Sequence, residues 1–317
     1  MIQVENVTKR FGQRVALDSL NFTVDKGEIL GFLGPNGAGK STTMNIITGY
    51  LSATNGTVKV DGHEILEEPE AVKKQIGYMP EQPPLYLDMT VADYLSFVCD
   101  IKGVPRQQKR ENIDRALSMI ALTDVRGRLI KNLSKGYKQR VGVAQALIGT
   151  PPVLILDEPT IGLDPQQIIE TRNLIRELGK EHTIILSSHI LPEVAAVCTR
   201  VLIINKGRIV VSDTPDNLSK GMVGDNKLTL RVAGAEKQAL DALRAVAHVV
   251  KAQSLGSREP GTVDVMVEAK REHDIRKPVF YAMSKADLPI LSMRAMDVSL
   301  EDIFLNLTTE EKEVSST

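Results

Sequence analysis

Residues 34–41 read GPNGAGKS, which fits the phosphate-loop pattern G-x-x-x-x-G-K-[ST] at every position. An apolar run over residues 28–33 leads straight into this loop, and residues 41–48 are predicted to form a helix. The motif requires this order of strand, loop and helix, because the loop N–H groups and the positive end of the helix converge on phosphate oxygens. The stretch therefore predicts an α/β fold that binds a nucleotide.

Within the loop, the residue types match the chemistry of phosphate binding. Gly34, Gly37 and Gly39 let the backbone turn its N–H groups inward around phosphate oxygens. Lys40 supplies a positive charge to the β- and γ-phosphates, and Ser41 offers a hydroxyl to Mg²⁺. The alternative, a chance glycine-rich turn, is disfavoured by the complete match and by the flanking strand and helix.

A second segment, VLILDEP at residues 153–159, is an apolar strand that ends in the carboxylates Asp157 and Glu158. At the end of a central parallel strand, an Asp can hold Mg²⁺ through water, as in phosphate-loop ATPases. The alternative is an ordinary Asp-Glu-Pro turn at a strand end. The presence of the phosphate loop in the same chain favours the functional interpretation.

Between these segments lies LSKGYKQR, residues 133–140. The three segments in this order resemble the ATP-binding subunits of ABC transporters, which carry an LSGGQ-like signature at this point. The resemblance spans residues 2–211 and implies a phosphate-loop NTPase fold with a parallel core sheet, an N-terminal antiparallel sheet and a helical subdomain. The signature and residues 298–304, VSLEDIF, look most like the ABC-2-type exporter branch, which includes gliding-motility-associated and multidrug-type ATPases.

The resemblance also implies a Mg²⁺-dependent ATPase that dimerises head to tail, so that the signature of one subunit reaches the ATP of the other. Ser134 and Gly136 would face the γ-phosphate held by the partner. Lys135 and Tyr137 depart from the common pattern, which has Gly and Gln at these positions. Because the two ligand positions are retained, we expect the composite site to be functional.

Catalytic roles follow from the same resemblance. Glu158 would polarise the attacking water, and His189, which closes the segment ILSSH, would contact the γ-phosphate beside Lys40. The position offering an oxygen to Mg²⁺ and the water lies four residues after a Gly in the preceding strand. Counting from Gly77 gives Glu81, with Gln82 as the alternative. A carboxylate is a suitable Mg²⁺ ligand, and with Ser41 and Asp157 it would complete the protein's set.

Adenine recognition is expected at Phe11, with Val15 packing beside the ring; the alternative for Phe11 is a core position in a small sheet. Asp164 closes the loop IGLD, which in the family communicates across the dimer. The pair Asp164-Pro165 also fits a helix N-cap, and both interpretations are compatible. The full set of expected ATP contacts is Phe11, Val15, Gly34, Pro35, Asn36, Gly37, Ala38, Gly39, Lys40, Ser41, Thr42, Ser134, Gly136 and Asp164.

The pattern of the chain predicts an ATPase domain over residues 1–220, with a helical subdomain at about 83–149. Residues 226–308 follow the order strand, helix, strand, strand, helix, strand, which matches a ferredoxin-like α+β module. A last amphipathic helix is expected at residues 299–307, and residues 309–317 are expected to form a flexible tail. This C-terminal part has no chemical motif, so we expect it to act in regulation or assembly.

The composition of the chain limits the classes of partner that we expect. The chain has 39 basic and 40 acidic residues, which gives no support to nucleic-acid binding. No apolar run approaches the roughly 20 residues that span a bilayer. The resemblance to ABC transporter subunits implies a peripheral protein at the cytoplasmic face of the plasma membrane, with a separate permease and a second copy or a paralogous ATPase as partners. Cys99 and Cys198 are expected to be buried thiols, and the remaining histidines (His63, His182, His248 and His273) to lie at the surface.

Two other functions were weighed. A soluble, non-transport ABC ATPase acting on ribosomes or DNA would carry two cassettes or a long coiled coil, and this chain shows neither. A regulatory module that binds ATP without turnover would lack the base or the phosphate lysine, whereas Glu158 and Lys40 are both present. The sequence does not predict a cargo.

Overall fold

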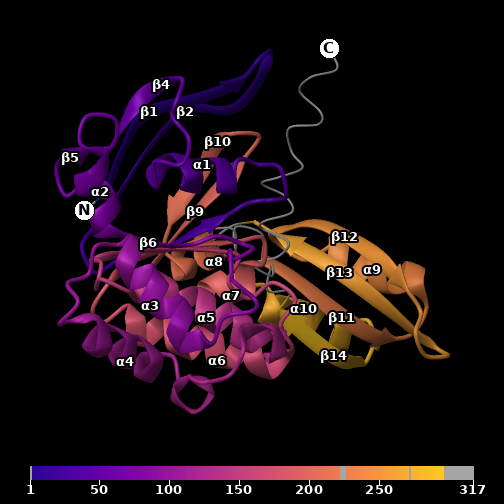
Figure 1. Ribbon diagram of the computed structural model, residues 1–317. Coiled ribbons are helices and arrows are strands. Elements are labelled where there is room, and N and C mark those ends of the chain that lie inside the picture. Colours follow the sequence, from indigo (N-terminus) through magenta and orange to yellow (C-terminus); the bar gives the residue numbers. More distant parts are fainter. Residues whose placement is uncertain (1, 222–225, 271–272, 296–317) are drawn as a thin grey trace. The chain divides into compact units, whose positions relative to one another are not determined.

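A computed structural model describes residues 2–221, 226–270 and 273–295 (Figure 1). The chain folds as two compact units, with the boundary between Pro215 and Asp216. Within the described residues, no helix is both long and apolar enough to cross a membrane.

The first unit is built around a six-stranded sheet with the order β10-β9-β3-β8-β7-β6, in which all neighbours are parallel except β10 and β9. Strands β3, β7 and β8 are buried along their whole lengths, as expected for apolar runs in a parallel sheet. Their carboxyl ends meet at one edge, where Leu33 pairs with Ser188 and Asp157 with Ser187. The strands are β3 (Ile29–Leu33), β6 (Ile76–Met79), β7 (Val153–Asp157), β8 (Thr183–Ser188), β9 (Arg200–Asn205) and β10 (Arg208–Asp213).

An antiparallel sheet with the order β2-β1-β4-β5 lies beside it and shares its core. Its strands are β1 (Ile2–Phe11), β2 (Arg14–Val24), β4 (Asn55–Val60) and β5 (His63–Glu64). Phe22 of β2 and Phe32 of β3 pack with ring centroids 5.7 Å apart. Met44 of α1 (Lys40–Ile47) is buried in the same cluster, so the helix after the phosphate loop is anchored between the two sheets.

Helices form the part of the first unit between β6 and β7. They are α3 (Val91–Ile101), α4 (Lys109–Met119) and α5 (Lys135–Leu147), with 3₁₀ turns at Thr123–Val125 and Ile130–Asn132. Thr90 caps α3 and Ser134 caps α5, each accepting a hydrogen bond from a backbone N–H three residues later. Helix α6 (Pro165–Leu178) joins β7 to β8. Three short helices were not predicted: α2 (Pro69–Gln75), α7 (Leu191–Ala195) and α8 (Pro215–Gly221).

The second unit has a four-stranded, fully antiparallel sheet with the order β12-β13-β11-β14. Its elements are β11 (Asn226–Ala233), α9 (Glu236–Arg244), β12 (Val249–Gly256), β13 (Thr262–Ala269), α10 (Arg276–Lys285) and β14 (Ile290–Ala295). Leu243 of α9 and Met283 of α10 pack with strand residues such as Val265 in a separate core. The helix expected at residues 299–307 and the tail at 309–317 lie outside the described residues.

Candidate active site

A cavity of about 500 Å³ opens at the carboxyl edge of the central sheet of the first unit. Many of the residues predicted from sequence line it: Phe11, Asn36, Gly37, Gly39, Lys40, Ser41, Thr42, Glu81, Glu158 and His189. Arg14, Ala16 and Ile161 line it as well and were not predicted. The residues come from five separate parts of the chain: four follow or precede strands of the central sheet or its phosphate loop, and Phe11, Arg14 and Ala16 come from β1 and β2 of the antiparallel sheet.

The phosphate loop has the backbone shape that its glycines allow. Gly37 and Gly39 have φ of +81° and +114°, a region that favours glycine. An ideal Cβ on Gly34 would lie 2.5 Å from the carbonyl oxygen of Ile204, so no larger residue fits there. Lys40 is buried, and its ammonium donates hydrogen bonds to the carbonyls of Gly34 (2.7 Å) and Pro35 (3.4 Å). The loop therefore curls around the lysine that begins α1.

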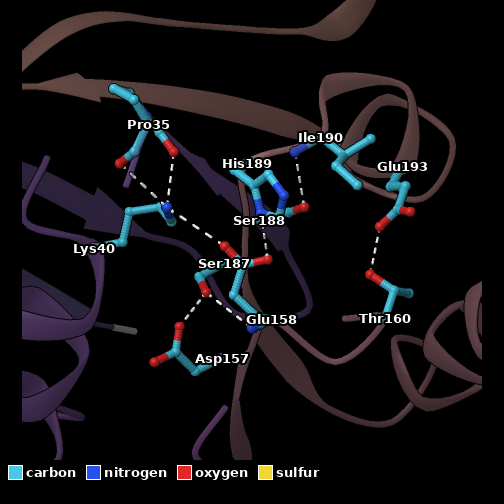
Figure 2. Close-up of polar contacts among 11 residues, drawn as sticks. Pro35, Lys40, Asp157, Glu158, Thr160, Ser187, Ser188, His189, Ile190 and Glu193 are labelled. Carbon is cyan, nitrogen blue, oxygen red and sulfur yellow. Dashed lines mark hydrogen bonds and ion pairs between the residues drawn. The ribbon is translucent and has the colours of Figure 1, made fainter. Parts of the chain in front are cut away.

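Glu158 is the centre of the polar contacts in the cavity (Figure 2). Its Oε1 lies 3.4 Å from Lys40 Nζ, and its Oε2 lies 2.9 Å from His189 Nδ1. The carboxylate is only 5% exposed, so water screens these contacts little. Glu158 thus joins the phosphate loop to the end of β8.

The backbone of Glu158 is held in an uncommon conformation. Its φ is +48°, which is costly for a residue with a side chain. The N–H of Glu158 donates to both the carbonyl (3.2 Å) and the hydroxyl (3.1 Å) of Ser187. Ser187 in turn donates its hydroxyl proton to Asp157 Oδ1. One buried serine therefore fixes the two carboxylates that close β7.

The oxygen atoms expected to hold a metal ion lie at or beside the cavity. Ser41 and Glu81 line it, whereas Gln82 does not, and Asp157 is buried directly behind it. Burial and then the charges of Asp157 and Glu81 raise the pKa of Tyr78, so both carboxylates lie near this phenol. Hydroxyl and carboxylate oxygens suit Mg²⁺. No group of three His, Cys, Asp or Glu side chains that could hold a metal occurs among the described residues.

Phe11 is not a core residue, which excludes the structural alternative. Its side chain is 50% exposed at the end of β1 and lines the cavity. Lys9 Nζ lies 5.2 Å from the ring centroid. Val15 is also exposed but is not among the lining residues. Phe11 therefore presents an accessible aromatic surface next to the phosphate loop.

The signature residues lie away from this cavity. Ser134 Oγ accepts a hydrogen bond from the N–H of Tyr137, and an ideal Cβ on Gly136 would lie 2.6 Å from Gln167 Oε1. A second cavity of about 290 Å³ is lined by Gly136 and Asp164 among others. Asp164 accepts a hydrogen bond from the N–H of Gln167 (2.9 Å), which confirms the N-cap interpretation. Neither Ser134 nor Gly136 lines the cavity that contains Lys40.

Among the minor expectations, the buried thiols are confirmed and one histidine is corrected. Cys99 and Cys198 are free and buried, and burial raises the pKa of each. His182 was expected at the surface but is buried, with Nδ1 2.8 Å from the carbonyl of Pro151. The residue directly precedes β8, all of whose residues are buried.

Comparison with known proteins agrees with this geometry. The family described as "ABC transporter" matches residues 17–161. The linearmycin resistance ATP-binding protein LnrL of Bacillus subtilis (strain 168) is 32% identical over 97% of this chain and 98% of its own length. The bacitracin transport ATP-binding protein BcrA of Bacillus licheniformis is 38% identical over 69% and 72%, respectively.

Among solved structures, the dimeric, post-hydrolysis state of the ATP-binding cassette MJ0796, bound to ADP and Pi, is 25% identical with a TM-score of 0.61. The match covers 68% of this chain and 99% of the MJ0796 chain. The near full-length match to LnrL, together with the phosphate loop and its contacts to Glu158, shows the family. The chain belongs to the ABC transporter ATP-binding proteins, and it is an ATP-hydrolysing subunit of such a transporter.

Proposed function

We propose that this subunit hydrolyses ATP at a site completed by a second, head-to-tail ATPase subunit and so drives a separate permease that exports its cargo. The observation that carries this proposal is the contact of Lys40 and His189 with one buried carboxylate, Glu158, in a cavity that the signature does not reach. Export is proposed because LnrL, which matches 97% of this chain, is named a linearmycin resistance protein. A permease partner places the subunit at the cytoplasmic face of the plasma membrane.

The first unit would bind ATP through the phosphate loop. Its N–H groups and the N-terminal end of α1 face the phosphates, and Lys40 neutralises the β- and γ-phosphate charge. To do so, Lys40 exchanges its contact with Glu158 for one with the nucleotide. The exposed ring of Phe11 offers a surface for stacking on adenine, with Val15 at its side.

Mg²⁺ would be held by Ser41, Glu81 and Asp157, whose oxygens fit this ion. When bound, the ion would supply positive charge that neutralises the phosphate oxygens. We prefer Glu81 to Gln82 because Glu81 lines the cavity.

Hydrolysis would rest on positioning and charge neutralisation. Glu158 accepts a hydrogen bond from the attacking water and orients it toward the γ-phosphate. His189 contacts the Glu158 carboxylate through Nδ1. The opposite edge of its ring would contact the γ-phosphate. The shared hydrogen bond from the Glu158 N–H to the carbonyl and the hydroxyl of Ser187 keeps this arrangement in place while the nucleotide turns over.

The second subunit would supply Ser134 and Gly136 at the start of α5. Both lie outside the chain's own nucleotide cavity, which is the arrangement that a site shared between two subunits requires. Asp164 lines the same small cavity as Gly136 and would couple the two sites across the dimer. The dimeric cassette MJ0796 supports this assembly.

The second unit would be a ferredoxin-like module that acts in regulation or assembly. The proposed domain limits are residues 1–220 for the ATPase domain and residues 226–308 for this module. The support is its strand order, in which the hairpin strand β13 lies between β11 and β12 and β14 flanks β11. Its core is separate from that of the first unit.

Lys40→Ala is expected to weaken ATP binding about 10- to 100-fold, because a charge-assisted contact to phosphate is lost. Isothermal titration calorimetry measures the change. Lys26→Ala, which removes an exposed lysine from a turn, is the matched control and should leave the affinity unchanged. Unchanged affinity in the Lys40 variant would show that residues 34–41 do not bind the nucleotide's phosphates.

Truncation after Lys220 is expected to leave a folded protein that binds ATP with unaltered affinity, because the first unit has its own core. Dimerisation or coupling to the permease should change. Circular dichroism and calorimetry test the first part. Loss of ATP binding by a truncated protein that is still folded would refute the proposed division of labour.

A further inference from the structure

Thr160 and Glu193 form a buried hydrogen bond that the proposed chemistry does not use (Figure 2). Thr160 is 8% exposed and Glu193 is 5% exposed, and the threonine hydroxyl donates to Glu193 Oε2. Neither residue lines the nucleotide cavity. Thr160 follows Glu158 closely in the chain, and Glu193 follows His189. The bond therefore joins the two segments that carry the Glu158–His189 contact.

On the Thr160 side, the bond holds a tight turn. The N–H of Ile161 donates to the carbonyl of Glu158 (3.2 Å), so residues 158–161 form a β-turn. Pro159 stands at the second position, where its fixed φ suits such a turn. Thr160 is the third residue. Fixing its side chain fixes the turn from which the Glu158 carboxylate emerges with φ of +48°.

On the Glu193 side, the bond is not needed to hold α7 in place. Leu191 and Val194 are fully buried, and an ideal Cβ on Gly31 would lie 2.0 Å from Val194 Cγ1. Apolar packing thus anchors the helix directly on β3. A buried carboxylate adds a cost unless it is hydrogen-bonded. Thr160 is its only side-chain partner within the part of the chain that the structure describes.

We propose that Thr160 and Glu193 are positioning residues for hydrolysis, which lock the turn after Glu158 to the helix after His189. The lock keeps Glu158 Oε2 and His189 Nδ1 at 2.9 Å when ATP takes Lys40 away from the carboxylate. The inference rests on the proposed role of Glu158. Without the lock, the carboxylate remains present but its direction toward the water is no longer fixed.

The test is steady-state ATP hydrolysis by variants of the full chain, with ATP affinity measured in parallel. Thr160→Val should lower kcat about 10- to 100-fold, the scale seen when a reacting group is misplaced by about 1 Å, with affinity unchanged. Thr160→Ser, which keeps the hydroxyl, should restore most of kcat. Thr183→Val is the matched control, because it removes an equally buried threonine hydroxyl, bonded to the N–H of Gly27, at the far end of β8.

The double variant Thr160→Val/Glu193→Leu should be no slower than Thr160→Val alone, because each change removes one partner of the same hydrogen bond. The inference is overturned if the two losses multiply, if Thr183→Val lowers kcat as much as Thr160→Val, or if Thr160→Val keeps kcat within about twofold. If Thr160→Val does not fold, Glu193→Leu alone decides, since it removes the acceptor of the Thr160 hydroxyl and should lower kcat without changing affinity. Full turnover by Glu158→Gln would instead refute the role of Glu158 itself.

Discussion

Glu158→Gln is expected to lower multiple-turnover ATP hydrolysis about 10²- to 10⁴-fold, the usual contribution of a positioned general base. ATP binding should remain intact, because the phosphate loop is unchanged and the amide removes a negative charge that faces Lys40 at 3.4 Å. The closed dimer could no longer hydrolyse its bound ATP, so the variant should accumulate as an ATP-bound dimer. Phosphate release and sedimentation in the presence of ATP measure the two effects.

The matched control is Glu177→Gln, which neutralises an exposed carboxylate of α6 paired with Lys180. Such surface pairs contribute little, so its turnover should equal that of the wild type. Wild-type turnover by Glu158→Gln would mean that another group activates the water.

Ser134→Arg is expected to abolish ATP-induced dimerisation and, with it, hydrolysis, while ATP binding by the monomer is retained. Ser134 is exposed at the start of α5 and lies outside its own chain's nucleotide cavity. A large cation there would block the partner's nucleotide. Loss of the helix cap costs only about 1 kcal/mol, so the fold should survive. Light scattering with ATP and phosphate release are the measurements.

Ser118→Arg, which places the same side chain on an exposed position of α4, is the control and should dimerise normally. Normal dimerisation by Ser134→Arg would show that the signature does not face a partner's nucleotide.

The central strands and the phosphate loop could be predicted because their signals are local. Strands β3, β7 and β8 each have an apolar run at their centre, and the loop between β3 and α1 has a fixed pattern of glycines. The alternation of strands and helices in the second unit was also readable. Helices α2, α7 and α8 were missed because segments of five to seven residues are too short to show a helical period.

The contacts that complete the site could not be predicted from spacing. Ser187 reaches Asp157 and the backbone of Glu158 only because β7 and β8 pair in one register, which a single sequence does not reveal. The Thr160–Glu193 bond depends on the same pairing. The exposure of Phe11 could not be predicted for a different reason. An aromatic residue at the end of a short strand has the same local pattern whether it is buried or exposed.

The most direct test of the shared site is to mix Lys40→Ala protein with Ser134→Arg protein and to measure ATP hydrolysis. Each variant alone should be inactive, for lack of phosphate binding or of a usable signature. In a mixed dimer, the intact phosphate loop of one subunit meets the intact signature of the other. At equal amounts, only mixed dimers bring an intact phosphate loop and an intact signature together, at one of their two sites, so turnover should rise clearly above that of either variant and reach at most about half of the wild-type value. A mixture that forms no dimers and stays as inactive as its two components would contradict the account.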